Sequence, residues 1–228
     1  MARFFAILVA CFAIGACTTT DSRTAIGIGQ PREGATVLLV RPDVQLALLT
    51  AAGLPEPRAD WSDEATANLE RSFTSQLSGS RYAIKSIDPE SAMGGRSGQL
   101  LRLHEAVGTS IALFEYGPYR LPTKKGSFAW TLGEGASSLA DEYGADYALF
   151  VFANGTYASS GRIATTLVLA AFGVSVPLGS QQAFVSLVDL RTGQIIWFNM
   201  AVAGPQADMR NPSGSDSLVT SLLKDAPL

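Results

Sequence analysis

Residues 139–153 read Leu139-Ala-Asp-Glu-Tyr-Gly-Ala-Asp-Tyr-Ala-Leu-Phe-Val-Phe-Ala153, and this stretch decides the fold. Leu139 and Tyr143 are four residues apart, the spacing of one helix face, and Gly144 is the residue type that most often ends a helix. The run after Asp146 is continuously apolar, as in a strand that is buried on both faces. A helix that leads directly into such a strand predicts an α/β domain.

The strongest hairpin signal in the chain lies at residues 183–199. Two apolar segments, Ala183–Leu190 and Gln194–Asn199, flank the tripeptide Arg191-Thr192-Gly193. A short connection with glycine in its last position is typical of a tight antiparallel turn in which the glycine adopts a positive φ. We therefore expect a C-terminal β-hairpin, with Trp197 packed on the sheet.

The N-terminal half of the chain extends this pattern. Thr36–Arg41 is a β-branched apolar run that ends at Pro42, which predicts a central strand, and Tyr82–Ile87 predicts a second strand. Between these strands a helix is expected to begin near Asp60, with one apolar stripe at four-residue spacing. The stripe consists of Trp61, Ala65, Leu69, Phe73 and Leu77.

The remaining elements complete one domain. Apolar spacing predicts two more helices, at residues 100–111 and 218–223. The fold class is therefore predicted to be α/β, on the border with α+β, in a single domain over residues 35–228. We expect a mixed central sheet, helices packed on it and the C-terminal hairpin.

The first seventeen residues have the order of a secretory signal. Arg3 precedes an apolar run from Phe4 to Ile14, which is shorter than the roughly 20 residues that a membrane-spanning helix needs. The segment Ile14-Gly15-Ala16-Cys17 resembles the lipobox of bacterial lipoproteins. We predict a signal peptide over residues 1–16 and acylation of Cys17 with palmitate-type chains. The alternative is an ordinary signal that is cut elsewhere, with Cys17 incidental.

The lipobox resemblance implies a location. Residues 17–34 are expected to be the acylated cysteine and a flexible tether, because the segment is polar and rich in glycine. Stable anchoring needs more than one acyl chain, and bacterial lipoproteins generally have several. Thr18, and not an aspartate, follows Cys17, which in enteric-type sorting indicates the periplasmic face of the outer membrane. The inner membrane stays open as an alternative.

Composition excludes several classes of function. The 228 residues include 17 Lys and Arg against 20 Asp and Glu, for a net charge of −3, and the basic residues form no cluster. We therefore expect no nucleic-acid partner. Of the two cysteines, Cys11 lies in the predicted signal and Cys17 at the predicted acylation site. The domain is thus expected to contain no disulfide and no thiolate metal site.

Candidate catalytic residues are few. His104, the single histidine, is adjacent to Glu105, and neighbouring residues on a helix do not face each other. We expect a structural or surface role for His104. The sequence has no Gly-x-Ser-x-Gly elbow, and Gly133–Ser138 resembles a helix start more than a phosphate loop. We predict that the protein is not an enzyme, with no catalytic, cofactor-binding or metal-binding residue and Cys17 as its one site, for lipidation.

Two motifs resemble those of a group of periplasmic lipoprotein domains. They are the helix-to-strand junction Leu139–Val151 and the hairpin Ala183–Trp197. Curli-secretion lipoproteins, penicillin-binding-protein activator lipoproteins and related uncharacterised families have similar junctions and hairpins. The resemblance covers about residues 36–201 and implies a sandwich-like α/β domain on a lipid tether. It also implies a non-enzymatic accessory module of the cell envelope that binds envelope proteins, here unidentified.

Two alternative functions stay open. The first is a subunit of an oligomeric outer-membrane secretion or pore assembly, in which copies of the chain would be partners of one another. The second is a hydrolase with an unrecognised site in the loop Tyr116–Trp130, which is expected to be exposed and combines aromatic residues with Lys124 and Lys125.

Ile163–Pro177 is an unusual, uncharged run of 15 residues. As a helix it would extend only about 22 Å, short of the roughly 30 Å hydrocarbon core of a bilayer. The favoured interpretation is a buried helix or strand that covers the sheet beside Phe150 and Phe152. The other interpretation is an exposed apolar element that assembles with copies of itself or inserts into a bilayer.

Overall fold

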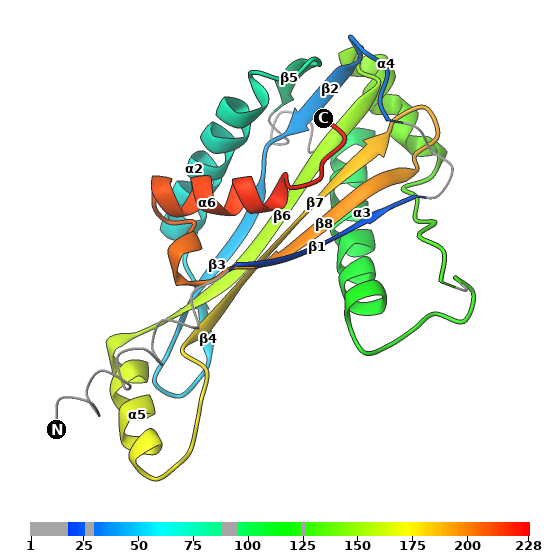
Figure 1. The fold of residues 1–228 in the computed structure, drawn as a ribbon. Coiled ribbons are helices and arrows are strands. Elements are labelled where there is room, and N and C mark those ends of the chain that lie inside the picture. The colour runs from blue at the N-terminus through cyan, green and yellow to red at the C-terminus, as the bar shows by residue number, and fades with distance from the viewer. Residues whose placement is uncertain (1–17, 26–29, 88–94, 125) are drawn as a thin grey trace, which may run out of the picture.

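The computed structural model describes residues 18–25, 30–87, 95–124 and 126–228. The predicted signal peptide and Cys17 lie outside these ranges. The described strands form one mixed eight-stranded sheet (Figure 1). The strands are β1 (Thr19–Thr24), β2 (Thr36–Val40), β3 (Asp43–Leu49), β4 (Pro55–Pro57), β5 (Ala83–Ile87), β6 (Tyr147–Ala158), β7 (Gly179–Asp189) and β8 (Ile195–Val202).

The long strand β6 organises the sheet. The order is β1-β8-β7-β6-β2-β5, and β3 pairs with β6 beyond the end of β2. The β2–β5, β2–β6 and β3–β6 pairs are parallel, whereas β6–β7, β7–β8 and β8–β1 are antiparallel. β2 and β3 pair with β6 along the same edge, one after the other, and Arg41 and Pro42 separate them. The predicted mixed sheet is confirmed.

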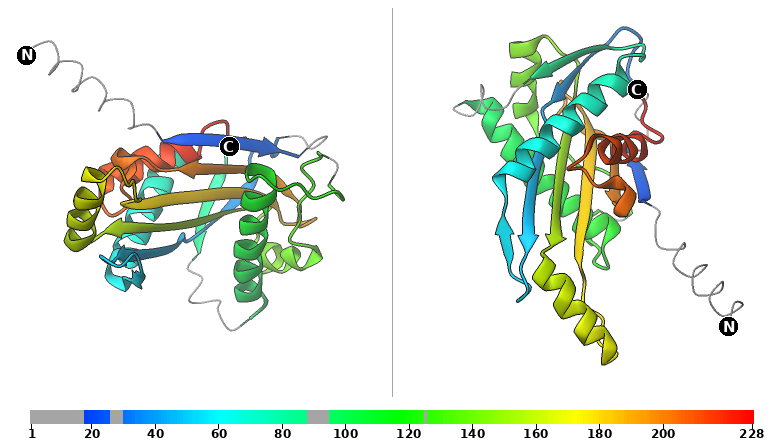
Figure 2. Two further views of the ribbon diagram at one scale, coloured as in Figure 1. Left: turned by 90° about the horizontal axis from the view of Figure 1, so that it is seen from below. Right: turned by 90° about the vertical axis from the view of Figure 1, so that its left-hand side faces the viewer.

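Helices lie on both faces of this sheet (Figure 2). One face packs against α2 and α6, and the other packs against α3 and α4. The described helices are α2 (Ala59–Leu77), α3 (Arg96–Ile111), the π-helical turn η3 (Ala112–Tyr116), the 3₁₀ turn η4 (Glu134–Ala136), α4 (Ser137–Tyr143), α5 (Ser160–Ala171), the 3₁₀ turn η5 (Pro205–Ala207) and α6 (Pro212–Leu222).

The central strands supply both cores, which explains their continuous apolar sequences. In β2, Val37 and Leu39 pack on the α2 and α6 side, while Leu38 and Val40 pack on the α3 and α4 side. Successive side chains of a strand point to opposite faces of the sheet. When both faces are covered, every position is buried, and the strand is apolar throughout. The prediction of a central strand at residues 36–41 is therefore confirmed.

Other predicted elements occur as expected. The stripe on α2 is buried from Ala65 to Leu77, and α4 ends at Gly144 in the left-handed conformation, with φ 60°. Gly193 also has a positive φ of 72° in the β7–β8 turn. The carboxylate of Asp146 accepts a hydrogen bond from the Thr36 N–H at 3.0 Å, and this contact joins the start of β6 to the start of β2.

The prediction of a flexible tether over residues 17–34 is wrong for Thr19–Thr24. This segment forms β1, which pairs antiparallel with β8 in a register that places Thr19 opposite Val202. An edge strand is joined to its neighbour by backbone hydrogen bonds, so its polar side chains do not prevent pairing. Ala25, directly after the strand, is buried and its N–H donates to the Ile196 carbonyl at 3.0 Å.

The favoured interpretation of Ile163–Pro177 as a buried element is also wrong. The segment contains most of α5, and none of the residues of this fully described helix is buried. The helix connects β6 to β7 beyond their last paired residues, Tyr157 and Gly179. It therefore projects from one end of the sheet and lies over neither face (Figure 1).

The loop Tyr116–Trp130, predicted to be exposed, differs at its C-terminal end. Phe128 and Trp130 are both buried in the core on the α3 side of the sheet. The Trp130 Nε1–H donates to the Glu115 side chain at 2.9 Å. The burial of these aromatic rings therefore fixes this end of the loop against the domain. The glycine and lysine residues of the segment gave no indication of this.

Candidate functional site

Two features outside the packed cores are candidates for function. We call the first the kink pocket; it lies where Arg41 and Pro42 separate β2 from β3. We call the second the α5 tip. The tip consists of the exposed apolar side chains Leu54, Ile163, Leu167, Val168, Phe172, Val174 and Leu178.

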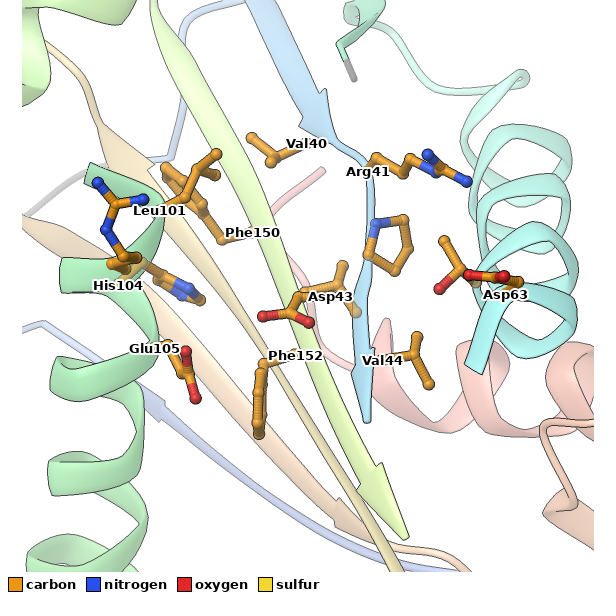
Figure 3. Close-up of a pocket in the computed structure, with 14 residues that line it drawn as sticks. Val40, Arg41, Asp43, Val44, Asp63, Leu101, His104, Glu105, Phe150 and Phe152 are labelled. Atoms are coloured by element: carbon orange, nitrogen blue, oxygen red, sulfur yellow. The ribbon is translucent and has the colours of Figure 1, made fainter. Parts of the chain in front are cut away.

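The kink pocket has a volume of about 320 Å³. Its walls are the β2–β3 junction, the middle of β6, one side of α3 and the first turns of α2 (Figure 3). Pro42 ends β2 and β3 begins at the next residue, so two strands pair with β6 in succession and leave a gap between them and α3. The charged side chains of the wall are Arg41, Asp43, Asp63, Arg102 and Glu105.

Asp43 has the most unusual environment of these groups. Burial raises the pKa of its carboxyl above the ordinary value of 3.8, and the negative charge of Glu105 raises it further. Gln45 partly offsets this through a hydrogen bond. Arg41 lies 3.7 Å from Glu70 on α2. The pocket thus brings together charges of both signs, which suits a polar partner group better than an apolar ligand.

His104 lines the same pocket but belongs to the core. The residue is 4% exposed, and its ring is stacked on Phe150 with a centroid distance of 4.5 Å. Its Nε2 lies 2.5 Å from the Ser186 hydroxyl, which is fully buried. Burial lowers the pKa of His104 from 6.5 to about 3, so the ring is neutral at physiological pH. The pair is a structural hydrogen bond, because no substrate can reach a fully buried hydroxyl.

The lysines that motivated the hydrolase alternative have different positions. Lys125 lies outside the described residues. The Lys124 ammonium donates to the Ala129 carbonyl and lies 4.2 Å from the Trp130 ring centroid. Both contacts hold the loop in shape. Within the described ranges, no three metal-ligating side chains gather in one place.

The α5 tip is the more unusual of the two features, because it exposes large apolar side chains to solvent. Phe172 is 80% exposed and Leu167 is 68% exposed. The sequence has no charged residue from Ile163 to Val188. No helix in the described part of the chain has both the length and the hydropathy needed to cross a bilayer. The tip is therefore an exposed apolar projection on the end of the sheet.

Contacts at the base of the tip hold it in place. Ser159 caps α5 by accepting a hydrogen bond from the Arg162 N–H at 3.1 Å. The Arg162 guanidinium donates to the Pro177 carbonyl at 3.1 Å, which closes the loop after the helix. The same guanidinium lies against Gly53 in the β3–β4 turn, so that turn and α5 form one projection.

Aromatic and cationic side chains lie between the tip and the body of the domain. We call this group the aromatic collar; it consists of Arg58, Trp61, Tyr157 and Arg210. Trp61 and Tyr157 meet edge to face at 5.7 Å. The guanidinium of Arg58 lies 4.2 Å from the Trp61 ring centroid, and that of Arg210 lies 3.5 Å from the Tyr157 ring centroid. Tyr157 is the collar residue on β6, and it lies one residue before the end of that strand.

The N-terminal end of the described chain lies in the half of the sheet that is nearer to α5. Thr19 pairs with Val202, Val202 pairs with Gln182, and Gln182 pairs with Asn154 on β6. Ala158, where β6 ends, is four positions after Asn154, which is a distance of roughly 13 Å along the strand. β1 therefore begins in the half of the sheet nearer to α5, at an edge that is three strands away from β6. Sequence patterns could not reveal this, because β1 was not expected.

Comparisons with known proteins give distant structural neighbours. Neither a protein-family model nor a curated protein matches the chain. A PelC dodecamer from Paraburkholderia phytofirmans is similar at 12% identity and a TM-score of 0.40, over 93% of this chain and 98% of that chain. The C-terminal domain of LpoB from Salmonella enterica is similar at 19% identity and a TM-score of 0.29, over 78% of this chain and 87% of that chain. These similarities assign no family, and the superfamily implied by the two sequence motifs stays a prediction.

Proposed function

We propose that this protein is a lipid-anchored lipoprotein of the bacterial envelope that acts by binding and not by catalysis. It is held at the periplasmic face of the outer membrane through acyl chains on Cys17. Its domain serves as an accessory module for envelope proteins.

The observation that supports a binding role most directly is the exposure of the α5 tip. Leaving apolar surface exposed to water is less favourable than burying it by about 25 cal/mol per Å². Monomeric soluble proteins rarely gather such side chains in one patch unless the patch contacts something. Seven large apolar side chains form the tip, so this surface has a partner.

The environment of His104 supports a non-enzymatic role. The chain has one histidine, and its imidazole is neutral, stacked on Phe150 and hydrogen-bonded to the buried Ser186. An acid–base role needs a group that titrates near the working pH and reaches the substrate.

In the proposal, the charged side chains of the kink pocket supply polar contacts to a protein partner.

Metabolic labelling with an alkyne palmitate analogue tests the anchor. The wild-type protein should become labelled and should sediment with outer-membrane vesicles in a density gradient. Cys17→Ala should lose the label, whereas Thr18→Ala, a neighbouring control, should keep it. A wild-type protein without label, or a label that persists in Cys17→Ala, would overturn the proposed anchor.

A second candidate function is a subunit of an oligomeric secretion or pore assembly. The α5 tip also favours this candidate, because an apolar projection can pack against copies of itself. Native mass spectrometry of the detergent-extracted lipoprotein distinguishes the two. A single mass equal to one chain supports the monomeric accessory module, whereas a discrete larger mass that is lost in Leu167→Glu supports the assembly.

A further inference from the structure

We infer that the α5 tip inserts into the lipid leaflet that contains the acyl chains of Cys17, so that the domain has two membrane contacts. The occupant of this apolar surface is a phospholipid bilayer. The inference deepens the proposed function, on which it rests for the presence of the anchor.

The position of the N-terminal strand points to the bilayer. Thr18, the first described residue, accepts a hydrogen bond from the Gly204 N–H, and the register places the start of β1 at the level of Asn154, in the half of the sheet that ends at α5. Thr18 directly follows Cys17 in the sequence. A cysteine whose acyl chains lie in a membrane therefore keeps this half of the sheet near the membrane surface.

The distribution of apolar side chains on α5 favours lipid over a second protein copy. At 100° per residue, Ile163, Leu167, Val168 and Phe172 spread over about half of the helix circumference. Leu54 adds an exposed side chain from the β3–β4 turn. A protein interface usually covers one patch and is bounded by a polar rim, whereas the chain has no charged residue from Ile163 to Val188 that could form such a rim.

The depth of insertion follows from the size of the tip and from the collar. A helix of 12 residues extends about 18 Å, which is too short to cross a bilayer and suits an element in the interfacial region. Tryptophan and tyrosine are enriched where membranes meet water. Tyr157, which meets Trp61 edge to face, lies one residue before the end of β6, after which α5 follows. The aromatic collar is thus at the height of the lipid headgroups.

Electrostatic attraction contributes little to this contact. Arg58 pairs with Asp60, and Arg210 pairs with Asp208 at 2.8 Å, so the cations of the collar are neutralised by adjacent carboxylates. Insertion should therefore occur in zwitterionic membranes and should change little with salt, because Arg162, whose guanidinium donates to the Pro177 carbonyl, is among the described residues the one cation of the tip and the collar outside these ion pairs.

The test uses the full, acylated lipoprotein in vesicles of zwitterionic phosphatidylcholine. Single cysteines, Leu167→Cys or Phe172→Cys, are labelled with the environment-sensitive fluorophore NBD; lipidation occupies the sulfur of Cys17. Ser78→Cys is the matched control, because Ser78 is exposed at the opposite end of α2. Lipids with a nitroxide on the acyl chain should quench most of the fluorescence at residues 167 and 172 and leave that at residue 78 unchanged.

The outcomes separate the tip from the anchor. Palmitate label on Cys17 without nitroxide quenching at residues 167 and 172 overturns the inference and leaves the proposed function standing. Quenching without palmitate label supports the tip contact and overturns the anchor. Blue-shifted fluorescence that nitroxide lipids do not quench shows a contact between copies of the chain and overturns the inference. Quenching that occurs only when an anionic lipid is added to the vesicles contradicts the apolar basis of the contact.

Discussion

At the scale of single residues, His104 shows how burial determines chemistry. An imidazole beside a glutamate in the sequence has the residue types of an acid–base pair, yet Nε2 of this ring faces Ser186. The cost of placing a charge in the core lowers the pKa of His104 to about 3. The ring of His104 is therefore neutral at physiological pH and contributes to the packing of α3 on the sheet.

This environment makes stability depend on pH. Below pH 6.5 the unfolded chain protonates His104, whereas the folded chain does not until about pH 3. The unfolded state thus binds more protons in this window, and the stability of the wild type should fall by up to about 1.4 kcal/mol per pH unit as the pH decreases. Urea denaturation of wild type and His104→Gln from pH 7 to pH 4 measures the difference. Equal slopes for the two proteins would contradict the assigned burial.

At the scale of elements, the structure separates strands that side chains specify from strands that backbone pairing specifies. The predicted strands at residues 36–41 and 146–153 have apolar residues for two cores, and both are found. Thr19–Thr24 has no such pattern, because an edge strand can be joined through its backbone alone. The sequence of β1 is therefore compatible with a tether until the free edge of β8 is known.

The register of β1 gives a matched pair of variants. The Ala25 N–H donates to β8, so by the alternation of an antiparallel pair the Asp21 N–H also faces β8 and the Ser22 N–H faces away. Asp21→Pro should detach β1, because proline has no N–H to donate. Ser22→Pro should leave it attached. Hydrogen exchange at β8 should rise in the first variant and stay near wild type in the second; similar protection in both would refute the register.

Two further features depend on tertiary structure and have no local sequence signal. Asp43 and Glu105 are far apart in the chain and approach each other only because α3 packs beside the break between β2 and β3. An uncharged apolar run such as residues 163–177 is compatible with a core helix or an exposed one. Its exposure follows from the β6–β7 register, which ends before the helix begins.

At the scale of the whole molecule, folding and surface contact are located in different parts of the chain. The two cores lie on either face of the sheet, and α5 belongs to neither core. Changes in the tip should therefore affect membrane contact without affecting the fold. The same type of substitution placed in β6 should have the opposite effect.

A pair of identical substitutions tests this division. Val168 in α5 is 60% exposed, so Val168→Asp should change the free energy of unfolding by no more than about 1 kcal/mol. Val151 in β6 is 4% exposed, and Val151→Asp should cost several kcal/mol because it buries an unpaired carboxylate. Thermal denaturation gives the stability, and flotation with phosphatidylcholine vesicles gives the membrane contact. In proteins that lack the anchor through Cys17→Ala, Val168→Asp should float less well than the protein with Val168, at unchanged melting temperature, since a charge on the tip opposes its transfer into lipid. A Val168→Asp variant that melts early would mean that α5 is part of the core.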